Sequence, residues 1–124
     1  MKDKDFKKHK RRVELSAKKW LAVLGLKWWD IEIVYVDDIG NSQHDGQFKI
    51  AMTCTAMWQY MTAEIDVAVA VVAEMTDDEI DRAFLHECMH ILVSEMRERK
   101  DRENHEERVC QLLVKAFKWV EEVR

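Results

Sequence analysis

The 124-residue sequence predicts an α+β domain in which an N-terminal helix, a small, mostly antiparallel sheet and two C-terminal helices follow one another. Three observations support this class. Apolar residues recur at helical spacing near both ends of the chain, and β-branched and aromatic residues concentrate in its middle part. A helix-capping motif, Thr-Asp-Asp-Glu at residues 76–79, follows that middle part. The length allows a single domain over residues 1–124, which is large enough to fold without disulfide bonds.

The first part of the chain is expected to contain a helix, a strand and a loop. Residues 5–24 place apolar side chains on one helical face, and Gly25 after them favours a left-handed helix end. Residues 31–36 are rich in β-branched and aromatic side chains, which predicts a strand. Residues 37–46 gather turn-forming residues and therefore predict an exposed loop.

The remaining elements are a hairpin and two helices. Residues 48–58 and 61–72 form two extended runs with a short connection, which suggests an antiparallel hairpin. The motif at residues 76–79 begins the strongest predicted helix, which should extend to about residues 97–99. Residues 103–123 predict a last helix. Its expected apolar face comprises Val109, Leu112, Leu113, Ala116, Phe117 and Val120.

Composition narrows the class of protein. Hydrophobic residues make up 48% and charged residues 35%, as in an ordinary globular protein. The longest stretch without charge, residues 50–63, is too short and too polar to span a membrane. Cys54, Cys88 and Cys110 are an odd number, and no signal-peptide pattern stands at Met1. We therefore expect a reduced, cytoplasmic protein without a membrane partner, and we expect a monomer.

Charge is distributed unevenly along the chain. The net charge is −4, but residues 2–19 hold nine Lys and Arg against three Asp and Glu, so the rest carries about −10. The favoured interpretation of this basic arm is the solvated face of a helix, because no base-reading motif accompanies it. Nucleic acid is therefore not expected as the main ligand, although the arm leaves a nucleic-acid or acidic partner open.

Residues 86–90 read His-Glu-Cys-Met-His, an H-E-x-x-H motif inside a predicted helix. His86 and His90 lie one helical turn apart on the same face, so both imidazoles can bind one Zn²⁺. Glu87 projects roughly 100° around the helix axis, where it can take a proton from a water whose pKa the metal lowers. Histidines bonded only to backbone or to each other are the alternative. The two histidines and Glu87 stand in apolar surroundings, where each polar group needs a partner, and one zinc ion satisfies all three.

A catalytic zinc usually has three protein ligands and an open position, so a third ligand is expected from the last helix. One turn before its apolar face stand His105 and Glu106, either of which could point inward, whereas Glu107 lies farther round. We prefer Glu106, with His105 as the alternative. Thiolate ligation is disfavoured, because Cys88 lies off the histidine face and Cys110 is first of all a small buried hydrophobe.

An H-E-x-x-H helix followed by a helix that bears a glutamate resembles the zincin metallopeptidases, in particular a minimal form of the gluzincin branch, over residues 31–120. Small phage-encoded and bacterial zincin-like proteins are similarly reduced. The resemblance implies that His86, His90 and Glu106 bind Zn²⁺ and that Glu87 is the general base. The residues after His90 (Ile-Leu-Val-Ser-Glu-Met) lack the Gly and His of metzincins and exclude that branch.

The resemblance also implies a substrate-binding edge strand, which we place in residues 61–69, where an extended peptide would pair antiparallel. An oxyanion stabiliser is expected from Tyr60, His44 or an unused His105. Cys110 stands where larger gluzincins place an Asp that supports a ligand histidine.

The predicted function is therefore a zinc-dependent metallopeptidase that hydrolyses a peptide or protein substrate. The alternative is a non-catalytic, zinc-stabilised regulatory or interaction domain whose metal is closed by a fourth protein ligand. A nucleic-acid-associated protease recruited through the basic arm is a third hypothesis. The presence of Glu87 favours the enzyme, because a structural zinc site has no use for it.

Overall fold

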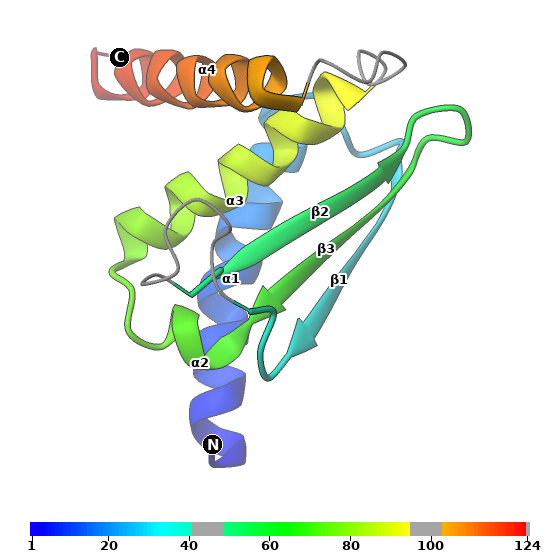
Figure 1. Cartoon of the computed structure of the whole chain (residues 1–124). Coiled ribbons are helices and arrows are strands. Elements are labelled where there is room, and N and C mark those ends of the chain that lie inside the picture. The colour runs from blue at the N-terminus through cyan, green and yellow to red at the C-terminus, as the bar shows by residue number, and fades with distance from the viewer. Residues whose placement is uncertain (41–48, 95–102, 124) are drawn as a thin grey trace.

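The computed structural model describes residues 1–40, 49–94 and 103–123. Its α+β architecture confirms the predicted class. The elements are α1 (Asp3–Val23), β1 (Asp30–Val36), β2 (Met52–Met57), β3 (Thr62–Ala68), α2 (Val69–Val72), α3 (Asp77–Leu92) and α4 (Glu103–Val123) (Figure 1).

The three strands form a mixed sheet in the order β1-β3-β2. β3 pairs in parallel with β1 and antiparallel with β2. The expectation of a mostly antiparallel sheet was therefore wrong for one of the two pairings. The placement of an edge strand in residues 61–69 was also wrong, because β3 is the central strand. Ile65 and Val67 on β3 are fully buried, which suits a central strand.

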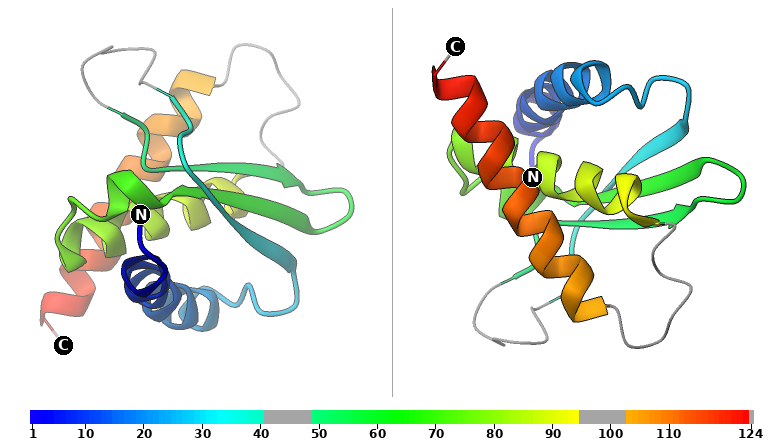
Figure 2. Two further views of the ribbon diagram at one scale, coloured as in Figure 1. Left: turned by 90° about the horizontal axis from the view of Figure 1, so that it is seen from below. Right: turned by 90° about the horizontal axis from the view of Figure 1, so that it is seen from above.

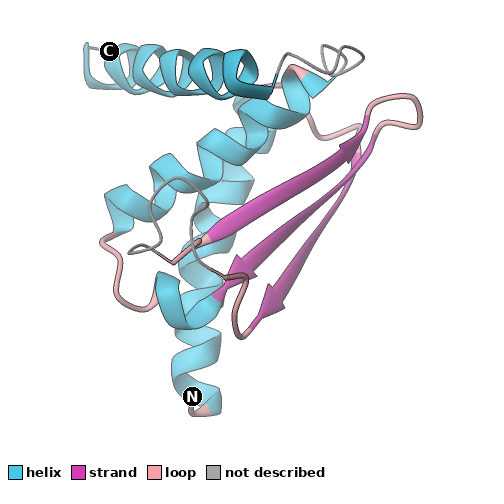
Figure 3. Ribbon diagram, in the orientation of Figure 1, coloured by secondary structure: helices cyan, strands magenta, loops and turns pink. Residues whose placement is uncertain are grey.

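α1 and α3 pack on one side of the sheet (Figure 3). Seen from above in Figure 2, α4 crosses α3, and the two helices are in contact. The buried apolar side chains of helices and sheet join in one core, in which Val13, Ile65 and Phe84 are fully buried. None of the described helices is both long and apolar enough to cross a membrane.

A buried carboxylate links the three long helices. Asp81 of α3 accepts hydrogen bonds from Ser16 Oγ (2.8 Å) and Trp20 Nε1 (3.0 Å) of α1. It also accepts from Lys19 Nζ and from Lys118 Nζ of α4, both at 2.9 Å. Two cations of the predicted basic arm thus have structural roles: Lys19 here, and Arg12, which donates to Asp77.

One strand boundary and one helix boundary differ from the predicted ones. The third extended run was expected to reach residue 72, but the strand ends at Ala68 and the short helix α2 follows. α3 ends at Leu92. The expected helix end at residues 97–99 lies outside the described part of the chain, which omits residues 95–102. The Ser94 hydroxyl donates to the carbonyl of Ile91 (2.8 Å) and so competes for a backbone group at this helix end.

The apolar face of α4 is rotated from the predicted one. Cys110, Val114 and Lys118 are buried, whereas Leu112 is 59% exposed and Val120 is 47% exposed. The prediction was wrong for these last two residues and for Ala116, which is also exposed, because the sequence holds more apolar side chains than one face accommodates. The rotation brings Glu107 as well as Glu106 toward α3.

Candidate metal centre

The capping motif at the start of α3 fixes the register of the H-E-x-x-H residues. Thr76 Oγ1 accepts a hydrogen bond from the backbone N–H of Glu79 (3.2 Å), and the Glu79 carboxylate accepts one from the backbone N–H of Thr76 (2.9 Å). Phe84 and Met89, which are fully buried, anchor α3 in the core. The helix thus confirms the predicted capping box.

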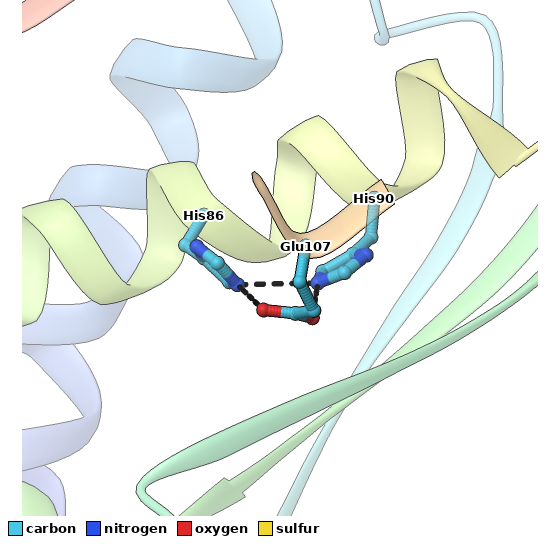
Figure 4. A group of neighbouring side chains, drawn as sticks. All are labelled: His86, His90 and Glu107. Carbon is cyan, nitrogen blue, oxygen red and sulfur yellow. Dashed lines mark hydrogen bonds and ion pairs between the residues drawn. The ribbon is translucent and has the colours of Figure 1, made fainter. Parts of the chain in front are cut away.

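The two histidines of the motif converge on one glutamate of α4 (Figure 4). The Nε2 atoms of His86 and His90 lie 3.1 Å apart. The Glu107 carboxylate places one oxygen 3.2 Å from His86 Nε2 and the other 2.6 Å from His90 Nε2. His90 is 7% exposed and Glu107 is exposed, so the group lies at the edge of the core.

The other nitrogen of His90 faces a second, more buried group. His90 Nδ1 lies 2.9 Å from Glu106 Oε1 and 3.6 Å from Cys110 Sγ. Glu106 is 3% exposed and Cys110 is fully buried. When Nδ1 carries the proton, it donates to the Glu106 carboxylate and leaves the Nε2 lone pair available for a metal.

Both groups have spacings that could hold a metal ion. Tetrahedral zinc with its usual bond lengths places nitrogen and oxygen ligand atoms about 3.3 Å apart, and nitrogen and sulfur about 3.6 Å apart. The 3.1 and 3.2 Å separations at His86 fit the first value, and the 3.6 Å between Cys110 and His90 fits the second. The 2.6 Å between His90 and Glu107 is that of a charge-assisted hydrogen bond, so this pair would separate slightly around an ion.

The neutral state of His86 favours metal binding at the first group. Burial lowers the pKa of His86 from its usual 6.5, outweighing the nearby Glu107 carboxylate, which acts in the opposite direction. His86 is therefore mostly neutral at pH 7, as a ligand must be. Burial raises the pKa of the Cys88 thiol, which stays protonated and is unsuited to ligation.

Glu87 lies beside this group without belonging to it. The side chain is 7% exposed and lines, with His86, a surface cavity of about 350 Å³ between α3, α4 and the start of β2. Ala51 and Met52 form the wall at β2. The structure thus combines two histidines, a glutamate on α4 and a further carboxylate in an accessible cavity.

No family model, curated protein or solved structure matches this chain.

The structure brings together His86, His90 and Glu106, but Glu106 contacts the nitrogen of His90 that faces away from His86. His44 and the side chain of His105 lie outside the described part of the chain. Tyr60 is 70% exposed in the turn after β2 and does not line the cavity beside Glu87.

Glu107 is the residue that sequence reasoning set aside. The sequence analysis places it farther round the helix because the predicted apolar face is centred near Val109. With the face centred on Cys110 and Val114, Glu107 turns toward α3. The signal available in the sequence was its spacing from that face: Glu107 precedes Cys110 by three residues and Val114 by seven, which are about one and two helical turns.

Proposed function

We propose that this protein is a zinc-dependent metallopeptidase of the minimal gluzincin type. The observation that carries the proposal is the convergence of His86 Nε2, His90 Nε2 and the Glu107 carboxylate within 3.2 Å of one another, beside a cavity that Glu87 lines. Bound zinc would supply Lewis acidity, which polarises a peptide carbonyl and lowers the pKa of a water.

The contacts assign different roles to Glu106 and Glu107. His86, His90 and Glu107 would hold the metal, and Glu106 would orient His90 through Nδ1. This assignment moves the third ligand from Glu106 to its neighbour. It keeps the predicted ligand chemistry of two imidazoles and one carboxylate.

Glu87 would serve first as a general base and then as a general acid. Its carboxylate would accept a proton from the attacking water and then deliver it to the amine that leaves when the peptide bond breaks. Its place in the cavity beside His86 supports this role. β2 is the edge strand nearest α3, so it replaces residues 61–69 as the strand along which an extended peptide would pair.

The second candidate function is that of a non-catalytic regulatory or interaction domain stabilised by a structural metal ion. It is favoured by the buried group of His90, Glu106 and Cys110, whose ligand atoms are shielded as in closed zinc sites. Such a domain would bind metal without catalysis.

Zinc binding by paired variants separates the two candidates. The catalytic site predicts that Glu107→Ala and His86→Ala weaken zinc binding strongly while Cys110→Ala has little effect. The structural site predicts the reverse. Hydrolysis of a mixed peptide library by the zinc-loaded protein, abolished in Glu87→Gln, would then establish the activity; a zinc-loaded protein that cleaves no peptide would contradict it.

A further inference from the structure

The cavity beside His86 and Glu87 extends away from the proposed metal ligands along α4. Glu107, Gln111 and Lys115 occupy successive turns of that helix, and the last two line the cavity. Eight residues of α-helix rise about 12 Å. Lys115 therefore lies about 12 Å from Glu107 along the α4 axis, where it lines the cavity.

Two basic side chains, Arg82 and Lys115, line this cavity, and of these two only Arg82 forms ion pairs with described residues. Arg82 Nε lies 2.8 Å from Asp78 Oδ2 and Arg82 also approaches Glu122. Lys115 is exposed and has no ion pair with any residue in the described ranges.

The sequence around Lys115 explains why its charge is not neutralised. The residues one turn away on α4 are Gln111, Leu112, Lys118 and Trp119, none of which is acidic. The neighbouring Lys118 contrasts with it, because its ammonium contacts three carboxylates.

Glu87 also lines the cavity, and Glu107 stands beside His86. A bound zinc ion would offset these two negative charges, whereas no described residue offsets the charge of Lys115. A substrate carboxylate would therefore be attracted to the ammonium group of Lys115.

We propose that this cavity binds a peptide whose carboxylate pairs with Lys115, a few residues from the scissile bond. An extended peptide rises about 3.3 Å per residue, so 12 Å corresponds to about three or four residues. The proposal rests on the proposed function, since it names the substrate class of that same site. The carboxylate is either an Asp or Glu side chain or the free C-terminus of the peptide.

Peptide binding tests the proposal without relying on turnover. The probes are fluorescein-labelled octapeptides of Ala, Gln and Leu with an amidated C-terminus, in which a single Glu is moved along the chain. A matching peptide without Glu but with a free C-terminal carboxylate tests whether the C-terminus, rather than an acidic side chain, pairs with Lys115. Binding to zinc-loaded Glu87→Gln protein is followed by fluorescence anisotropy.

At one Glu position, or with the free C-terminus, the acidic peptide should bind about threefold more tightly than its neutral counterpart, because exposed ion pairs are weak. The preference should disappear when Lys115→Gln is added and when salt is raised. It should persist with Lys18→Gln, a matched change at an exposed lysine on α1 that does not line the cavity.

Equal binding of acidic and neutral peptides, a preference that survives Lys115→Gln, or no peptide binding would each overturn the proposal. Failure of the proposed function is recognised separately, by absence of zinc uptake or of wild-type hydrolysis. A protein that binds zinc and cleaves peptides without acidic preference would refute this inference alone.

Discussion

Replacing Asp81 by Ala should destabilise the fold strongly, because this carboxylate joins α1, α3 and α4. Asp81 is 8% exposed and accepts four hydrogen bonds, two of them from lysines. Removing one partner of a buried ion pair costs about 3–5 kcal/mol. Lys118 keeps contacts with Asp78 (3.2 Å) and Glu121 (3.1 Å), so we expect the lower end, about 3 kcal/mol.

Urea unfolding at fixed zinc concentration measures this change in the free energy of unfolding. Asp77→Ala is the matched control on the same helix. Its side chain is 86% exposed and makes one ion pair, with Arg12, so its loss should stay below about 1 kcal/mol. Equal effects of the two substitutions would refute the claim that Asp81 is the linking residue.

The same comparison has a defined pH dependence. Burial opposes ionisation of Asp81, but hydrogen bonds from Lys118, Lys19, Ser16 and Trp20 outweigh it and hold the pKa below its usual 3.8. Because the folded-state pKa is lowered, this contribution to stability is fully present above the unfolded pKa of about 4. It is lost as the pH falls through the folded pKa. The stability difference between wild type and Asp81→Ala should therefore be constant from pH 7 to about 5 and shrink below about 4; a difference that grows in acid would contradict the reasoning.

Two further predictions concern the metal centre, and one concerns a tyrosine on β1. Glu87→Gln should retain zinc and the wild-type unfolding midpoint but lose hydrolysis, and wild-type cleavage by this variant would remove Glu87 from the mechanism. Glu106→Gln should weaken zinc binding about 10- to 100-fold through the orientation of His90, as measured by competition with a chelator. A loss from Glu106→Gln larger than that from Glu107→Gln would restore Glu106 as the direct ligand. In a Tyr60→Phe background, Tyr35, whose pKa burial raises to about 12, should show almost no phenolate absorbance at pH 10.5, and titration near 10 would contradict this effect of burial.

Local sequence patterns predicted the helix that carries the site. The capping box at Thr76 and Glu79 and the spacing of His86 and His90 each depend on residues within one turn of one another. Such short-range patterns survive folding because tertiary packing does not need to decide them. The structure accordingly confirms the α+β class and the start of α3.

The strand order and the rotation of α4 could not be predicted from local sequence patterns, because both depend on contacts between segments that are distant in the sequence. β3 enters between β1 and β2, and its parallel pairing with β1 joins residues about thirty positions apart. The rotation of α4 depends on which of several apolar residues packs on α3, and Leu112 and Cys110 were both candidates. That rotation determines whether Glu106 or Glu107 faces the two Nε2 atoms.

The most direct test of a metal centre at the H-E-x-x-H helix is the zinc stoichiometry and affinity of wild-type and His86→Ala protein. Metal analysis after dialysis gives the stoichiometry, and competition with a chromophoric chelator gives the affinity. The account predicts about one zinc per wild-type chain and a loss of at least 100-fold in affinity in His86→Ala, because one of three ligands is removed. Wild-type protein that takes up no zinc, or a His86→Ala variant that binds zinc as tightly as wild type, would contradict it.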